Sequence, residues 1–488
     1  MIVSRQSAGL VGGLLLFALA LLLPTPAGMS PVAQRAAAVT LLMAVWWMTE
    51  AIPIAATAFV PAALFPLLGI LDAKATAANY GHNYVLMFLA GFFIARAFEV
   101  HQLHRRIALN LIHRIGTSRR LIILSFMLAT ALLSMWIANV AVTLLMLPIG
   151  MAIASRDDGK GGGFAVALML AIAYSASIGG TGSLVGTPPN MVFVGMVKTM
   201  YPQAPDVTFV DWMEIGIPFV ICMLPVTWFF LTRSFGVTGS FSGSREIITG
   251  ELQALGPMQP GEQRVLGIFL LTGLGWIFRD VWAEAMGVEH LVHDATVAVA
   301  AALALFVLPA GGSETKGTRL LDWQQAQTVP WGVAMIVGGG YAIAKGFAAT
   351  GLATWLGGAM APIAALPVPV IVLLVVLFMT FITEINSNTA TASIFLPVLA
   401  TMAAAGNTHP FLLMIPATFA CSCAFMLPSG TGPNAVIFGS GQVTIPQMSR
   451  AGLRMNLISV VVLSMIMVLF VIPLLNISGT VPEWAILP

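Results

Sequence analysis

Apolar runs long enough to cross a lipid bilayer recur along the whole of this 488-residue sequence, and this feature limits the possible folds more than any other. A helix needs about 20 predominantly apolar residues to cross roughly 30 Å of hydrocarbon. Hydrophobic residues make up 58% of the chain and charged residues only 8%, whereas a soluble globular domain carries about 25% charged residues. The alternating pattern of an outer-membrane barrel is absent, so we predict an all-α polytopic membrane protein.

The predicted apolar segments differ in length. The stretch from Leu121 to Ser155 would extend about 52 Å as one helix, at 1.5 Å per residue, which is too long for one crossing and too short for two. Residues 367–405 present the same problem, so we predict that each segment is a re-entrant helical hairpin whose tip lines a cavity or is buried in protein. About eleven transmembrane helices then remain. The predicted segments are 8–25, 33–50, 53–71, 84–101, 121–154, 164–199, 215–232, 264–283, 293–309, 329–349, 367–405, 410–438 and 452–476.

The basic residues predict the orientation, because cytoplasmic loops collect Lys and Arg. With the N-terminus inside, fifteen of the 21 Lys and Arg residues fall in inside segments and four fall outside, while Arg96 and Lys345 stay within spans. Those two lie near span ends, where snorkelling and a functional role are both open. The stretch from Gly479 to Pro488 contains Glu483 and no basic residue. We predict a multi-pass protein of the cytoplasmic membrane with a cytoplasmic N-terminus and an external C-terminus.

The two predicted hairpins resemble each other. Asn139 and Asn388 lie 249 residues apart and occupy similar surroundings. A constant offset between segments that are predicted to face opposite ways indicates an inverted repeat. Transporters with such repeats place substrate and ion sites near the midplane, where broken helices from both halves meet. The same offset relates Pro148 to Pro397, Arg96 to Lys345, and Leu103 to Leu352.

Residues that break helices or carry neutral oxygens gather in two further paired segments, 175–190 and 428–434. Gly and Pro free backbone groups. Freed carbonyls can hold a bare Na⁺, and the N-terminus of a half-helix can hold a carboxylate. Close helix packing is the alternative for a single segment of this kind. Four paired segments that each contain Asn favour a binding site.

Several other functions are excluded. The sequence contains no Walker motif, no HExxH, no GxSxG and no basic face for nucleic acid. The polar clusters are neutral, so we predict no enzyme. A channel would select with rings of carbonyls or charges, and linear instead of saturable flux would identify one. Cys222, Cys421 and Cys423 lie in apolar segments, which predicts buried thiols.

Three groups of residues resemble the divalent anion:sodium symporter (DASS) family, which includes dicarboxylate, citrate and sulfate transporters. They are the segment from Trp46 to Pro53, the hairpin tip Ser387-Asn388-Thr389, and the two Pro-Asn loops. The resemblance covers nearly the whole chain. It implies an eleven-span inverted repeat with two re-entrant hairpins, a homodimer in lipid, and a transport domain that slides past a scaffold in the elevator manner.

The resemblance also implies a division of the chain into four parts. Residues 1–120 would hold the scaffold helices of the first repeat, and 121–232 its hairpin and broken helix in the transport domain. Residues 233–366 would hold a cytoplasmic loop and the second set of scaffold helices, and 367–488 the second part of the transport domain. Glu384 stands in the motif Thr383-Glu384-Ile385-Asn386-Ser387, and we interpret it as a structural anchor of the second hairpin.

Carried over by motif, two sodium sites are implied. The first would use Ser134, Asn139 and the backbone around Gly182. The second would use Thr383, Asn388 and the backbone of Asn386 and Gly430. The substrate carboxylates would meet Asn139, Ser183, Ser387, Asn388, Thr389 and Thr431.

One departure from the family pattern affects the first tip. It reads Ala138-Asn139-Val140, where the family usually has Ser-Asn-Thr, so two hydroxyls are missing. The residues and the resemblance together predict a secondary active transporter, coupled to Na⁺, for a small divalent anion such as the C4 dicarboxylates succinate, malate or fumarate. A sodium-independent dicarboxylate or tricarboxylate exchanger and a sulfate transporter are the alternatives.

Overall fold

The structure is a computed structural model that describes residues 5–485 apart from 115–117, 157–162, 241–242, 312–316, 365 and 478–480. Within these residues it is helical, with two isolated β-bridges and no strand. Pro488, which is predicted to be external, lies outside the described residues. The first twelve helices are α1 (Arg5–Leu22), α2 (Pro31–Thr49), α3 (Ile54–Thr57), α4 (Val60–Leu67), α5 (Ala73–Ala78), α6 (Asn83–Val100), α7 (Leu103–Arg114), α8 (Arg119–Ser134), α9 (Asn139–Ser155), α10 (Phe164–Gly180), α11 (Pro188–Met200) and α12 (Phe209–Ser234).

The remaining helices repeat much of this order. Eight helices of the described part are long and apolar enough to cross a membrane, or nine if α14 and α15, bent by 76°, form one span. The polytopic helical fold is therefore confirmed, while the count of eleven spans stays a prediction. The later helices are α13 (Gly243–Leu255), α14 (Pro260–Ile277), α15 (Arg279–Met286), α16 (Asp294–Val307), α17 (Trp323–Ala326), α18 (Trp331–Thr350), α19 (Leu352–Ala364), α20 (Val368–Ile382), α21 (Asn388–Ala405), α22 (Phe411–Cys421), α23 (Gly432–Gly439), α24 (Ile445–Ile466) and α25 (Ile472–Leu474).

The internal duplication is visible in the order of the helices. The series α6 to α12 corresponds to the series α18 to α24, and the starts of α7, α8 and α9 keep the offset found in the sequence. Leu103 begins α7 and Leu352 begins α19. Asn139 begins α9 and Asn388 begins α21. Each half thus contains two consecutive helix pairs, and a short break separates the two helices of each pair. The pairs are α8–α9 and α10–α11 in the first half, and α20–α21 and α22–α23 in the second.

Each over-long apolar segment consists of two helices. The chain breaks at Ala138, whose φ and ψ are −51° and 132°, and at Ser387, with φ −60° and ψ 136°. These extended conformations end the helical path, so α9 and α21 start in new directions. Both α8 and α9 pack against α10, and both α20 and α21 pack against α22.

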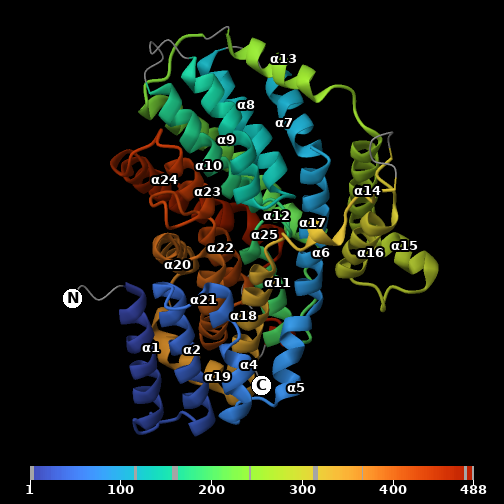
Figure 1. The fold of residues 1–488 in the computed structure, drawn as a ribbon. Helices are drawn as coiled ribbons and strands as arrows, with labels where there is room; N and C mark the ends of the chain where they lie inside the picture. Colours follow the sequence, from blue (N-terminus) through green and yellow to red (C-terminus); the bar gives the residue numbers. More distant parts are fainter. Residues whose placement is uncertain are drawn as a thin grey trace.

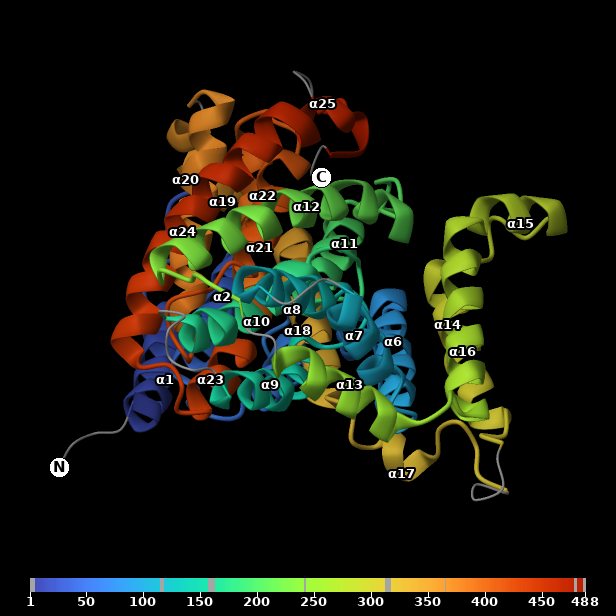
Figure 2. The same cartoon turned by 90° about the horizontal axis from the view of Figure 1, so that it is seen from above.

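The two halves pack crosswise. Helix α9 lies against α23, and α11 lies against α21, so the second helix of each over-long segment contacts the short helix of the other half. Figures 1 and 2 both place α9, α10 and α23 side by side. A Cβ added at Gly432, the first residue of α23, would lie 2.2 Å from Val140 Cγ2. Only glycine permits this approach between the first tip and the second loop.

Helices α14, α15 and α16 stand apart at one flank of the molecule. Figure 2 shows them beyond α6, on the side away from α24 and α20. Helix α16 packs along α6 and against α14. Their outer faces carry apolar side chains, and Leu271, Val281 and Leu303 are 69%, 66% and 60% exposed.

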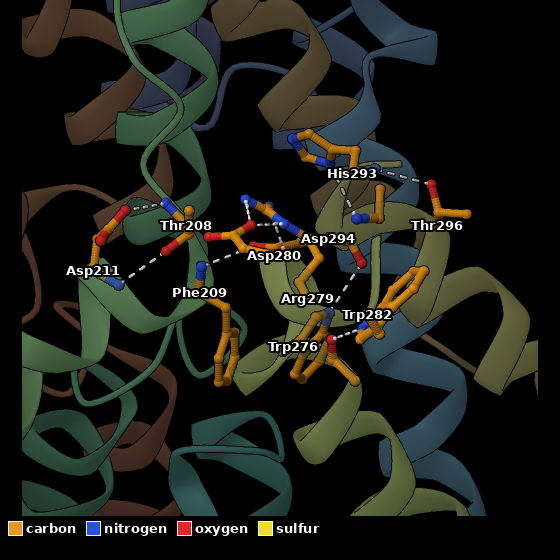
Figure 3. Close-up of polar contacts among 12 residues, drawn as sticks. Thr208, Phe209, Asp211, Trp276, Arg279, Asp280, Trp282, His293, Asp294 and Thr296 are labelled. Carbon is orange, nitrogen blue, oxygen red and sulfur yellow. Dashed lines mark hydrogen bonds and ion pairs between the residues drawn. The ribbon is translucent and has the colours of Figure 1, made fainter. Parts of the chain in front are cut away.

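A polar junction joins the start of α12 to this flank (Figure 3). Asp294, the first residue of α16, accepts a hydrogen bond from the Phe209 backbone N–H at 2.8 Å and from Arg279 Nη1 at 2.8 Å. Its backbone carbonyl accepts from the Trp276 indole at 3.0 Å. The Asp294 side chain is only 2% exposed, so its charge depends on the Arg279 guanidinium for compensation.

Candidate functional site

The breaks between α8 and α9 and between α20 and α21, which are the tips of the predicted hairpins, have matching hydrogen bonds. Ser134, at the end of α8, places Oγ 2.6 Å from Asn139 Oδ1 and donates to the Ala176 carbonyl at 2.8 Å. Thr383 repeats this pattern in the second half. Its Oγ1 lies 2.7 Å from Asn388 Oδ1 and 3.0 Å from the Cys421 carbonyl. In each half, a buried hydroxyl joins the tip asparagine to a carbonyl of the next helix.

The single proton of Ser134 fixes how Asn139 is oriented. The hydroxyl cannot donate fully to both the Ala176 carbonyl and an amide oxygen. With Nδ2 turned toward Ser134, Asn139 donates to Ser134 Oγ at 2.6 Å, to the Ala176 carbonyl at 3.2 Å and to the Gly186 carbonyl at 3.3 Å. This orientation pairs each donor with an acceptor and turns Oδ1 away from Ser134.

Two further asparagines hold the loops that follow α10 and α22. Asn190 Nδ2 donates to the carbonyls of Gly180 at 3.1 Å and Ser183 at 2.7 Å. Asn434 Nδ2 donates to the carbonyls of Ala424 and Leu427, each at 3.1 Å. The site prediction omitted both residues, although their paired positions in the Pro-Asn loops were a usable signal. They shape the loops that carry Gly182, Ser183, Gly430 and Thr431.

Glu384 anchors the second loop, which agrees with its predicted structural role. Its Oε1 accepts from the backbone N–H groups of Phe425 at 2.7 Å and Met426 at 2.8 Å, and from Asn456 Nδ2 at 2.8 Å. Oε2 accepts from the Leu427 N–H at 3.1 Å. The equivalent residue of the first half is Met135. There, the Ser183 hydroxyl donates to the Met135 carbonyl instead.

The predicted substrate contacts differ in exposure. Ser387, Asn388, Thr431 and Asn139 are half-buried, and Thr389 is 6% exposed. Ser183 is 0% exposed. The structure thus brings four of the six predicted substrate residues to an accessible surface of the tips and the second loop, while Thr389 is buried. In this conformation it does not bring Ser183 there.

The predicted ion ligands are neutral oxygens. Ser134 and Thr383 are 0% exposed, and Asn386 is 4% exposed with Nδ2 buried and without a hydrogen bond in the described part. A Cβ added at Gly186 would lie 2.4 Å from the Gly180 carbonyl oxygen and 2.9 Å from that of Ser134, so backbone carbonyls converge beside the first tip. Carbonyl and hydroxyl oxygens of broken helices suit Na⁺.

The described residues include no group of three or more His, Cys, Asp or Glu side chains that could hold a metal ion. Cys421 and Cys423 are buried, as predicted. The prediction for Cys222 was wrong, because this residue is exposed on α12. An apolar segment predicts membrane burial, and a thiol that faces lipid is as compatible with that as one in the protein core.

Helix N-termini supply the complementary anion-binding groups. α9 begins at Asn139 and α23 at Gly432, and the contact between Val140 and Gly432 brings these two N-termini together. Free N–H groups and the helix dipole at such ends attract carboxylates. The arrangement can therefore bind a small anion beside neutral cation ligands.

Known proteins resemble the chain over nearly its full length. Residues 4–477 match a family model described as the transmembrane region of sodium:sulfate symporters. The chain is 41% identical over 489 residues to a sodium-dependent dicarboxylate transporter, SdcS, of Staphylococcus saprophyticus, and the match covers 98% of this chain and 93% of that protein. A Staphylococcus aureus protein with the same name is 41% identical over 481 residues, with 96% and 92% covered.

Two solved structures share the fold at low identity. MtrF of Neisseria gonorrhoeae, described among antimetabolite efflux pumps, has a TM-score of 0.58 and 12% identity, and the match covers 96% of this chain and 95% of that one. The YdaH transporter of Alcanivorax borkumensis has a TM-score of 0.53 and 17% identity, with 89% and 98% covered. The relatives and the fold are those of membrane transporters.

Proposed function

The chain belongs to the sodium:sulfate symporter family, and from this membership we propose that it is a secondary active transporter that carries a C4 dicarboxylate dianion together with Na⁺. Succinate, malate and fumarate are dianions of this kind and are the proposed substrates. The curated relatives are named sodium-dependent dicarboxylate transporters, which supports both the ion and the substrate class.

The paired tips are the observation that carries this proposal. In each half, a buried hydroxyl links a tip asparagine to a carbonyl of the next helix. Two such centres suit two sodium ions. The first ion would be bound by Ser134, Asn139 and the Gly182 backbone. The second would be bound by Thr383, Asn388 and the backbone of Asn386 and Gly430. The helix N-termini at Asn139 and Gly432 suit the substrate carboxylates, which Ser387, Thr389 and Thr431 would also contact. The buried Ser183 would join them only after the first loop moves.

We also propose the movement and the assembly. The pairs α8–α9 and α20–α21 are re-entrant hairpins, and they travel with α10–α12 and α22–α25 as a transport domain against a scaffold of the remaining helices. The exposed apolar flank of α14 to α16 is covered by a second copy of the chain in lipid. The N-terminus is cytoplasmic and the C-terminus external, and a reporter fused after Pro488 should be active only in its external form.

The test is initial uptake of labelled succinate into proteoliposomes at varied external sodium. Saturable uptake that rises with sodium supports symport. Uptake that ignores sodium but requires internal dicarboxylate would replace symport with exchange. Competition by sulfate and citrate defines the substrate class.

The site assignment has its own test in the same assay. Asn139→Ala and Asn388→Ala each remove a side chain that we place at both ion and substrate, and a hydrogen bond to a charged group contributes about 1.5–3 kcal/mol. Each variant should lose at least about tenfold in affinity. Normal expression with unchanged kinetics in both variants would show that the site lies elsewhere.

A further inference from the structure

A cavity of about 550 Å³ lies beside the first tip, between the α6–α7 corner, α9 and α13. Its α9 wall is apolar and includes Ala141 and Leu144, which follow the tip residue Asn139 closely in sequence. Its α6–α7 wall is polar and includes Arg96, Gln102 and Arg105 together with Glu99. Glu251 of α13 also lines the cavity and pairs with Arg105. The cavity therefore runs from the tip along α9 toward the side on which α7 lies.

Within the described residues, the equivalent place of the duplicated half is closed by a helix contact. There, α18 packs directly against α21, and Ser393 is 0% exposed against Gly340. The equivalent residues of the first half are Leu144 and Gly91. Leu144 is 54% exposed and lines the cavity. The helix contact of one half is replaced by a water-accessible space in the other.

The polar wall carries donors that the protein does not use fully. Arg96 Nη1 donates to Glu99 Oε2 at 2.7 Å, and the Arg96 side chain remains 32% exposed. Its Nε is buried and has no hydrogen-bond partner in the described residues. A guanidinium offers five N–H groups and pairs readily with carboxylates. Because Nε is buried, the Nη groups of Arg96 are the ones that can hold a second carboxylate besides Glu99.

Gln102 occupies a backbone position that favours glycine. Its φ is +57°, and the equivalent residue of the second half is Gly351, with φ +76°. The left-handed conformation is unfavourable for a residue with a Cβ. Helices often end with one residue in this conformation, and Gln102 Nε2 donates to the Glu99 carbonyl at 3.2 Å. The hydrogen bond holds the amide at the edge of the cavity and leaves its second N–H available to a ligand.

The duplication indicates that the fold itself does not require this polar wall. Where the first half has Glu99, Gln102 and Arg105, the second half has Ala348, Gly351 and Thr354 at the equivalent positions. The corner between the long helix and the amphipathic helix forms in both halves. The polar side chains thus distinguish the first half from the second.

We propose that this cavity is a second, weaker binding site for a dicarboxylate dianion, with Arg96 and Gln102 as its donors, on the path between the first tip and the solution beside α7. The inference rests on the proposed function, since it takes the transported dianion as the ligand. Glu99 competes for Arg96 and keeps the site weak, as a transient site must be if the ligand is to leave it.

The site can be tested without measuring transport. Cys421 and Cys423 are buried, so the full-length Cys222→Ser variant offers a background for one engineered thiol. Ala152 lines the cavity and is exposed. The rate at which an anionic, membrane-impermeant thiosulfonate modifies Ala152→Cys is measured with increasing succinate in sodium-free choline medium. Choline chloride of the same ionic strength is the control for screening.

Succinate should slow the modification of Ala152→Cys. The succinate concentration that halves the modification rate, the half-protective concentration, should change when a donor residue is substituted. Arg96→Gln and Gln102→Gly should each raise it about threefold or more, whereas Glu99→Gln should lower it, because a partly exposed charge contact changes affinity by up to about fivefold. Lys345→Gln, the same charge loss at the equivalent position of the other half, should leave it unchanged. Gln102→Gly should melt at an equal or higher temperature, which separates a lost ligand contact from a damaged fold.

Two results would overturn the inference. One is absent protection, or an equal half-protective concentration in Arg96→Gln and the Lys345→Gln control. The other is protection that needs sodium and disappears in Asn388→Ala, which would place the ligand at the tips alone. Failure of the proposed function looks different: the wild type would then not take up succinate, while donor-dependent protection would persist.

Discussion

Val140 marks the main chemical difference between the two tips. Its counterpart in the second half is Thr389, and the preceding residues are Ala138 and Ser387. Val140 is 39% exposed, so a hydroxyl at this position could reach a ligand. Because the first tip offers the asparagine and backbone groups only, we expect the substrate to depend more on the hydroxyls of the second tip.

Exchanging the two residue types tests this expectation. Thr389→Val removes a hydroxyl at nearly constant volume and should weaken succinate affinity by about 1 kcal/mol, one ordinary hydrogen bond. Val140→Thr adds a hydroxyl in the same shape and should be tolerated, with affinity strengthened by up to about 1 kcal/mol. The concentration dependence of uptake in both variants is the measurement. The asymmetry would be contradicted if Thr389→Val strengthened the affinity for succinate or left it unchanged, or if Val140→Thr weakened it.

Glu384 stabilises the second loop through the backbone N–H groups of residues 425–427, which donate hydrogen bonds to its carboxylate. Replacing it by Gln places an amide nitrogen or a neutral oxygen against the three N–H groups of residues 425–427, which should destabilise the protein by about 2–4 kcal/mol, since hydrogen bonds to charged groups contribute 1.5–3 kcal/mol each. Affinity should also fall, because the anchored loop carries Thr431. The melting temperature of Glu384→Gln is compared with that of Glu50→Gln, the same change at an exposed residue. Equal melting temperatures would refute the anchor.

At the scale of helices, much of the architecture follows from local patterns. Over-long apolar runs identified the segments of α8–α9 and α20–α21, and Gly, Pro and Asn located the loops before α11 and α23. The constant offset identified the duplication. These features depend on backbone preferences and on segment length, and short stretches of sequence determine both.

The packing partners of these helices were not predictable in the same way. The contact between α9 and α23 joins residues from different halves, and nothing near Gly432 in the sequence specifies Val140 as its neighbour. The burial of Ser183 and the exposure of Cys222 also depend on which surfaces meet. From the sequence, a glycine indicates only a residue that breaks helices. Whether it also permits a close contact depends on the side chain opposite it, which the structure shows.

Gly432→Ala tests the crosswise contact. The added methyl would meet the stiff β-branched side chain of Val140, and overpacking of this kind costs about 1–3 kcal/mol. Gly439→Ala, in the same helix, meets nothing within 4 Å and is the matched control. Melting temperatures should fall for Gly432→Ala alone and recover in the double variant with Val140→Ala. Additive effects of the two substitutions would argue against direct contact.

At the scale of the whole molecule, the junction at Asp294 connects the segment 121–232 to the segment 233–366. We propose that these segments belong to different domains. The contact of Asp294 with the Phe209 N–H would then have to break whenever the domains slide. The buried carboxylate makes this junction specific, because Arg279 and the N–H group must both lie in place to compensate its charge.

Asp294→Asn keeps an acceptor for the Phe209 N–H but leaves Arg279, whose side chain is 15% exposed, without its buried partner. Breaking a buried ion pair by removing one partner is strongly destabilising, and we expect a loss of about 3 kcal/mol in stability. Asp280→Asn is the control, since Asp280 also pairs with Arg279 but is 84% exposed. It should melt within a degree or two of the wild type, as exposed pairs contribute little. A similar decrease in both variants would show that burial does not matter at this junction.

The crosswise contact between α9 and α23 also has a consequence for biosynthesis. Gly432 leaves the ribosome about 290 residues after Val140, which corresponds to roughly 15–60 s at 5–20 residues per second. During that interval the α8–α9 segment is already made but has no α23 to cover its break at Ala138. Its polar N–H groups must then be shielded by lipid headgroups, by water or by the insertion machinery. The order of synthesis therefore decides when the nascent chain first acquires a complete site.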